Sequence, residues 1–217
     1  MEYVKICGLK NIKNIQLCIE KNVNAVGFIY NVPDSPRNLN NVEINELLKK
    51  IPKEITTVLV FKPKTIPEIV DTIKIIETDL YQIHCSFNIR LLDKLPYDIK
   101  RKLIVALKLN SENKTVITQE INYSCNQFFG YVLDSSEGQG IEFDYDLISE
   151  VLKKTNGIKI ILAGGISINN VERIIKTLKP FGIDVSSSLE CAKGYKDPVK
   201  IKTFLEKLFE IKQEVVM

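Results

Sequence analysis

Short apolar runs rich in β-branched residues alternate along this chain with amphipathic stretches, about eight times in all. Most of these runs are continuously hydrophobic, as expected for strands of a parallel sheet covered on both faces. The predicted strands are Tyr3–Ile6, Ala25–Ile29, Thr57–Phe61, Leu80–Ile83, Leu103–Leu107, Tyr131–Leu133, Ile158–Leu162 and Ile183–Val185. An alternation this dense predicts a parallel sheet built from successive strand–helix units.

The amphipathic stretches between the strands predict helices. These are Ile12–Lys21, Ile44–Lys50, Ile66–Ile76, Tyr145–Lys154, Val171–Leu178 and Val199–Lys212. Several are preceded by polar residues that favour a helix N-terminus, namely Asn11, Thr65, Asp144 and Asn169. The fourth and fifth helical regions should be short or irregular. Pro96 interrupts one, and the other, Thr115–Asn122, is rich in β-branched residues that fit a helix poorly.

Eight strands in 217 residues predict a compact, single-domain (β/α)₈ TIM barrel spanning residues 1–217. An open doubly wound sheet is the alternative. That fold usually has a Gly-x-Gly-x-x-Gly segment after its first strand, and this chain has none. Unusual polar residues also follow many of the strands, as the mouth of a barrel requires.

Composition and charge exclude several classes of protein. The chain is 45% hydrophobic without a Pro/Gly-rich linker, which is consistent with one substantial core. The net charge of +3 is spread over the helical segments, so no nucleic-acid surface is expected. The first residues lack the pattern of a signal peptide, and no apolar run reaches the roughly 18 residues that span a membrane. We therefore expect a soluble, cytoplasmic protein with no membrane partner.

The five cysteines are odd in number, widely scattered and without a Cys-x-x-Cys pair, so neither disulfides nor a zinc site is expected. Cys7 differs from the others because it follows an apolar strand and precedes Gly8, which would point its thiol into a barrel mouth. An isolated cysteine is more often a buried packing residue. Lys5, however, lies on the same face of the strand, and its ammonium could favour the thiolate that a base requires.

Asp134 ends the sixth strand, at a place where an acidic residue serves no packing purpose. It could be a catalytic acid, or equally a cap or turn residue, because Ser135 and Ser136 follow it. The next segment, Glu137–Gly140, could close over a ligand or be a plain surface turn.

Two late loops have the features of a phosphate site. Gly164 and Gly165 leave the seventh strand, and Ser186, Ser187 and Ser188 follow the eighth. Free backbone N–H groups at such turns bind phosphate, and in many barrels phosphate lies at the loops after strands seven and eight. Two tight turns without a ligand are the alternative reading.

Two further side chains are candidates for substrate binding. Arg37 lies in a long loop rich in turn formers, and its guanidinium could hold a planar carboxylate or be an ordinary surface group. His84 is the only histidine and ends the fourth strand. It could contact a ligand or simply line the mouth.

In their order along the chain, these motifs resemble the phosphoribosylanthranilate isomerases of tryptophan biosynthesis. The similarity covers nearly the whole chain, and the opening Lys-Ile-Cys-Gly with the late Asp-Val-Ser-Ser is its most specific part. The matching segments are Lys5–Leu9, Gly27–Phe28, Ser35–Arg37, Gln82–His84, Leu133–Ser135, Gly140, Phe143–Asp144, Leu162–Gly165, Asp184–Ser187, Glu190, Gly194 and Lys196–Asp197.

The resemblance implies an Amadori rearrangement of N-(5-phospho-β-D-ribosyl)anthranilate with no metal or organic cofactor. Asp134 would be the general acid that protonates the furanose ring oxygen, and Cys7 the general base at sugar C2. Arg37 would hold the anthranilate carboxylate, Asp184 would lie near the substrate, and the two late loops would hold the phosphate. Asp134 would have to be kept protonated and Cys7 poised to ionise. The expected partner is this small phosphosugar, bound by a monomer or homodimer.

The chain departs from the family pattern at Cys85, Tyr145 and Ser188. Ser188 stands where the family usually has glycine, so its side chain could crowd the phosphate loop. Two rivals stay open. The related aminoaldose isomerase of histidine biosynthesis should have an acidic residue at the position of Cys7. A binding protein without turnover would keep the phosphate site alone.

Overall fold

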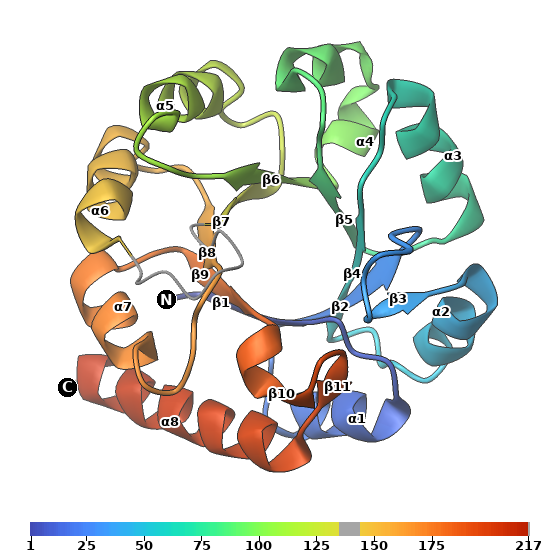
Figure 1. Ribbon diagram of the computed structural model, residues 1–217, viewed down its shortest axis with the longest axis vertical. Helices are drawn as coiled ribbons and strands as arrows, with labels where there is room; N and C mark the ends of the chain where they lie inside the picture. The colour runs from blue at the N-terminus through green and yellow to red at the C-terminus, as the bar shows by residue number, and fades with distance from the viewer. Residues whose placement is uncertain (135–143, 217) are drawn as a thin grey trace.

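The centre of the molecule is a closed ring of parallel strands (Figure 1), seen in a computed structural model that describes residues 1–134 and 144–216. Consecutive strands of the ring are neighbours, and β1 pairs with both β2 and β9, which closes it. The ring consists of β1 (Tyr3–Cys7), β2 (Ala25–Tyr30), β4 (Thr56–Phe61), β5 (Leu80–His84), β6 (Leu103–Lys108), β7 (Gly130–Asp134), β8 (Ile160–Ala163) and β9 (Gly182–Val185). The predicted (β/α)₈ barrel is confirmed, and the open sheet is excluded because the ring closes.

Helices surround the ring on its outer side (Figure 1). They are α1 (Ile12–Glu20), α2 (Asn41–Leu48), α3 (Ile66–Ile75), α4 (Tyr97–Lys100), α5 (Lys114–Tyr123), α6 (Tyr145–Lys154), α7 (Val171–Leu178) and α8 (Pro198–Val216). Smaller elements are β3 (Asn38–Leu39) beside β2, the 3₁₀ turns η1 (Ile89–Lys94) and η2 (Ser187–Leu189), and a hairpin of β10 (Glu190–Ala192) and β11 (Tyr195–Lys196). Among the described residues, no helix combines the length and apolar character needed to cross a membrane.

Local sequence explains most of the helix starts. The side chains of Asn11, Thr65 and Asp144 each accept a backbone N–H bond from the first turn of their helix, as predicted. The prediction for Asn169 is wrong by one residue, because Asn170 is the N-cap of α7. The side chain of Asn170 instead accepts the N–H of Ser167, in the turn that leads into the helix.

The two helical regions expected to be short or irregular differ from each other. The region interrupted by Pro96 is short, as expected, and is divided between η1 and α4. The prediction of a short or irregular fifth helix is wrong, since α5 runs for ten residues. Ile117 and Ile121 lie one turn apart in α5 and are buried in the core. Their burial outweighs the poor helix propensity of the β-branched residues around them.

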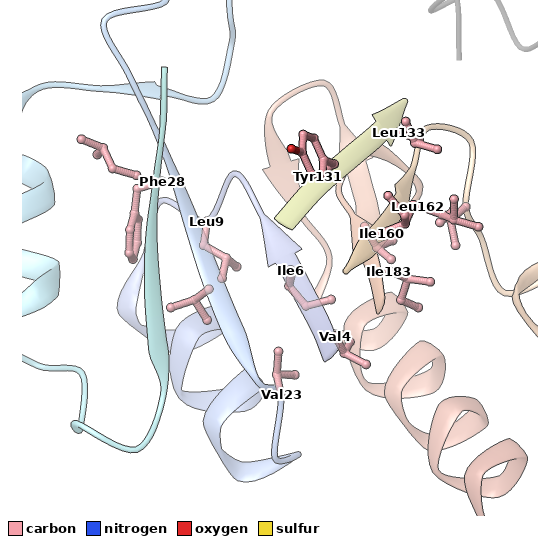
Figure 2. Packing of buried hydrophobic residues seen from close by; sticks show 14 of the residues in the cluster. Val4, Ile6, Leu9, Val23, Phe28, Tyr131, Leu133, Ile160, Leu162 and Ile183 are labelled. Carbon is pink, nitrogen blue, oxygen red and sulfur yellow. The ribbon is translucent and has the colours of Figure 1, made fainter. Parts of the chain in front are cut away.

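The core consists of two layers that alternate along each strand. On β1, Val4 and Ile6 belong to the large cluster between strands and helices, which Figure 2 shows from close by. Tyr3 and Cys7 belong to the smaller cluster inside the barrel. The strand ends therefore present their inward side chains, including Cys7, to the mouth of the barrel.

Truncating one residue of the large cluster between the strands and the helices tests this packing. Ile6 is completely buried, so we expect Ile6→Ala to lower the free energy of unfolding by about 2–5 kcal/mol in a urea titration. The control is Val42→Ala in α2, where the side chain is 65% exposed and the expected change is within about 0.5 kcal/mol. Similar losses in the two variants would contradict this description of the core.

Candidate active site

A cavity of about 290 Å³ opens at the carboxyl ends of the barrel strands. It is lined by every residue predicted for the site except Ser188, namely Cys7, Arg37, His84, Asp134, Gly164, Gly165, Asp184, Ser186 and Ser187. Chain segments far apart in sequence thus meet at one place. Within the described ranges, no group of His, Cys, Asp and Glu side chains has the arrangement that a metal ion requires.

A buried ion pair lies beside Cys7. The fully buried Lys5 donates from Nζ to Oδ2 of Asp184 at 2.7 Å, and its positive charge also acts on the Cys7 thiol. The pairing of β1 with β9 sets Lys5 directly opposite Asp184, so the strand register creates this contact. The other carboxylate oxygen of Asp184 is buried and has no hydrogen-bond partner among the described residues.

The ionisation of Cys7 differs from the expectation. Burial raises the pKa of the Cys7 thiol, and the negative charge of Asp184 raises it further. The positive charges of Lys5 and Lys196 lower this pKa, but the net shift is upward. The expected influence of Lys5 is present. The expectation of a thiol already poised to ionise is wrong for this structure, because burial outweighs the lysines.

Arg37 already has an internal partner. Its Nε and Nη2 atoms donate to the two carboxylate oxygens of Glu190, at 2.6 and 2.8 Å. The stem of Arg37 crosses Gly8, where a Cβ would lie 2.5 Å from Cδ of Arg37 and where φ is +76°. Glycine is therefore required at position 8 on both grounds. One N–H group of Nη1 and the second N–H group of Nη2 lie on the edge of the guanidinium that Glu190 does not use.

The two late loops surround the same part of the cavity. Gly164 and Gly165 both have positive φ values, +84° and +65°, which turn the chain sharply after β8. Ser188 does not line the cavity, because its hydroxyl donates to the carbonyl of Ile166 at 2.6 Å. Its side chain joins the two loops to each other and does not crowd the space between them.

His84 and Asp134 end β5 and β7 and also line the cavity, and Asp134 pairs with Ala163 of β8, the residue before Gly164. Burial, with a smaller effect of the charge of Lys62, lowers the pKa of His84 to about 4, although Asp134 acts in the opposite direction. The imidazole is therefore neutral at neutral pH, with Nε2 located 3.4 Å from Nε2 of Gln82. Ser135 and the segment Glu137–Gly140 lie outside the described residues.

Sequence reasoning assigned no role to three residues of this region. Lys62 lines the cavity directly after β4, and its position at the end of a predicted strand was the available signal. Gln82 lines the cavity from β5. Glu190 was part of the family match, but no sequence pattern indicated that it pairs with Arg37.

Comparisons with known proteins show the family of the chain. The family model described as N-(5'phosphoribosyl)anthranilate (PRA) isomerase matches residues 4–207. The chain belongs to this isomerase family. An N-(5'-phosphoribosyl)anthranilate isomerase of Pseudomonas putida (strain GB-1) is 31% identical over 218 residues, covering 94% of this chain and 97% of the relative.

Solved structures of the isomerase family have the same fold. A phosphoribosyl anthranilate isomerase in complex with reduced 1-(o-carboxyphenylamino)-1-deoxyribulose 5-phosphate is 28% identical, with a TM-score of 0.79. A structure of monomers generated from the dimeric enzyme of Thermotoga maritima is 25% identical, with a TM-score of 0.80. Each match covers 97% of this chain and 100% of the other.

The lowered pKa of His84 predicts a pH dependence of stability. Below its ordinary value of 6.5 the unfolded state binds a proton at His84, whereas the folded state does so only near pH 4. The contribution of His84 to the free energy of unfolding is therefore complete above about pH 6.5 and is lost as the pH falls toward 4. We expect His84→Asn to show a smaller drop in Tm than the wild type between about pH 7 and 5 in thermal unfolding. Equal drops would mean that His84 titrates normally in the fold.

Proposed function

We propose that this chain catalyses the Amadori rearrangement of N-(5-phosphoribosyl)anthranilate to 1-(2-carboxyphenylamino)-1-deoxy-D-ribulose 5-phosphate, a step of tryptophan biosynthesis. The observation that carries the proposal is the convergence of Cys7, Asp134 and the two glycine- and serine-containing loops on one cavity, in a chain of this isomerase family. The compound in the related complex has a phosphate and a carboxyphenyl group, the two groups that this site would have to hold.

In the proposed reaction, Asp134 donates a proton to the furanose ring oxygen. The bond between C1 and that oxygen breaks, and the anthranilate nitrogen supplies the electron pair that forms an iminium ion. Cys7 then removes the proton from C2, the C–H electrons form a C1–C2 double bond, and the nitrogen regains its electron pair. The resulting enolamine tautomerises to the ketone when C1 gains a proton and the C2 hydroxyl loses one.

The environment of Cys7 suits a base that acts late in this sequence. Its raised pKa keeps the thiol protonated at neutral pH, and only the thiolate can accept the proton from C2. The iminium formed by ring opening places a positive charge beside the thiol, and an adjacent positive charge lowers a thiol pKa. The thiol then releases its proton to water in the open cavity, so the thiolate forms at the stage when the base is required, with Lys5 acting in the same direction.

Binding of the two charged ends would orient the sugar between acid and base. The free edge of Arg37 would hold the anthranilate carboxylate. Backbone N–H groups of the loops at Gly164–Gly165 and Ser186–Ser187 would hold the phosphate. Ser188 would contribute only its backbone N–H, because its hydroxyl already donates to the carbonyl of Ile166. The unpartnered oxygen of Asp184 would accept a hydrogen bond from a sugar hydroxyl, and the neutral His84 would contact the substrate across the cavity.

Turnover of freshly generated phosphoribosylanthranilate, followed by the loss of its fluorescence, tests the proposal. We expect wild-type turnover, and we expect Cys7→Ala and Asp134→Asn each to lower kcat by about 100-fold or more, as for a positioned acid or base.

The matched control is Cys18→Ala, which removes another buried thiol, in α1, that does not line the cavity. It should keep near wild-type turnover. An inactive wild type would refute the proposed reaction, whereas full activity of Cys7→Ala would refute only the assignment of the base.

A further inference from the structure

Glu190 is the centre of a buried charge network at the edge of the cavity. It is the first residue of β10, directly after η2, and is only 8% exposed. Besides Arg37, its carboxylate accepts Nζ of Lys196 at 2.7 Å and the backbone N–H of Gly194 at 2.9 Å. Burial raises the pKa of Glu190, but these hydrogen bonds outweigh it and lower the pKa to about 2. Glu190 is therefore ionised and fully engaged.

Lys196 extends this network to the phosphate side of the cavity. Its Nζ donates to the backbone carbonyl of Ser186 at 3.1 Å and lies 3.2 Å from the Ser186 hydroxyl. That hydroxyl donates to the backbone carbonyl of Cys7 at 3.1 Å. One continuous chain of contacts thus runs from Arg37 through Glu190, Lys196 and Ser186 to Cys7.

The backbone holds the same parts in place. Gly194 turns the β10–β11 hairpin with φ at +84°, and a Cβ there would lie 2.6 Å from the carbonyl oxygen of Pro36. Lys10 donates to that same carbonyl at 2.9 Å. The residue before Arg37 is therefore held between the hairpin and the loop after β1, and the Arg37 side chain lies against Gly8.

We propose that Glu190 and Lys196 are positioning residues that act through Arg37 and Ser186. Glu190 occupies the Nε–Nη2 edge of the guanidinium, so a substrate carboxylate binds the opposite, Nη1–Nη2 edge. Lys196 fixes the distance between this carboxylate site and the phosphate-binding loop. The inference rests on the proposed function, in which Arg37 binds the anthranilate carboxylate.

The physical gain is preorganisation. A free arginine side chain loses rotamer freedom when it binds a ligand, and an arginine held in its bound geometry has already lost it. An ionised partner on one edge keeps the other edge directed toward the ligand. A carboxylate that used the edge occupied by Glu190 would have to displace a buried, bidentate ion pair.

Two ligands that differ only in the carboxylate test the inference. One is reduced 1-(o-carboxyphenylamino)-1-deoxyribulose 5-phosphate, and the other is the same compound with a plain phenyl ring. Calorimetry gives both Kd values for the wild type, Glu190→Gln and Lys196→Met. We expect the wild type to prefer the carboxylated ligand by about 10-fold or more, the effect of a charged hydrogen bond.

In Glu190→Gln we expect this preference to fall by about 10-fold, with the Kd of the phenyl ligand within about 2-fold of wild type. In Lys196→Met both ligands should bind more weakly, because the Ser186 loop loses its support. If Glu190 only stabilises the fold, Glu190→Gln should raise the Kd of both ligands by the same factor, and that result would overturn the inference.

The matched control is Glu172→Gln in α7, where an exposed carboxylate is also shared by two lysines, Lys176 and Lys207. It should leave both Kd values unchanged. If Glu190→Gln does not fold, the double variant Glu190→Gln/Lys196→Met removes one charge of each sign. The inference still requires this variant to lose the preference for the carboxylated ligand.

A wild type that binds both ligands equally well would refute the role of Arg37 in the proposed function, and the inference with it. A preference retained in the Glu190 variants would refute the inference alone.

Discussion

Lys5 and Asp184 meet across the seam where the first and last strands of the barrel pair, and both are withdrawn from water. Removing two charges from water is costly, and the loss of one partner of such a pair destabilises a protein by about 3–5 kcal/mol. This contact therefore joins the two strands that close the ring and also places a buried charge pair at the mouth of the barrel. Cys7 lies on the same strand, and the charges of Lys5 and Asp184 both act on its pKa, so its ionisation depends on how the ring closes.

Much of the site is predictable from sequence because a parallel barrel places the ends of all its strands at one mouth. Cys7, Asp134 and His84 each end a strand that an apolar run identifies, and the structure brings them to one cavity. The fold follows from the same pattern. One exception is α5, whose residues have poor intrinsic helix propensity and become helical because Ile117 and Ile121 are buried.

The remaining features depend on contacts between distant segments. Arg37 and Glu190 are 153 residues apart, and neither flanking sequence indicates the pairing. The sequence alone suggests that the side chain of Ser188 crowds the loop after β9, but its hydroxyl donates to the carbonyl of Ile166 on the neighbouring loop. The pKa of Cys7 follows from the balance between burial and nearby charges, and the extent of burial is a property of the folded molecule.

The most direct test of this account is an NMR titration of Cys7 in protein labelled at its cysteines, with Cys7→Ser used to assign the signal. Because burial dominates over the neighbouring lysines, Cys7 should titrate above the ordinary cysteine value of 9.0. A midpoint near or below neutral pH would contradict the account, since it would mean that Lys5 and Lys196 hold a thiolate in the barrel mouth without any charge from the substrate.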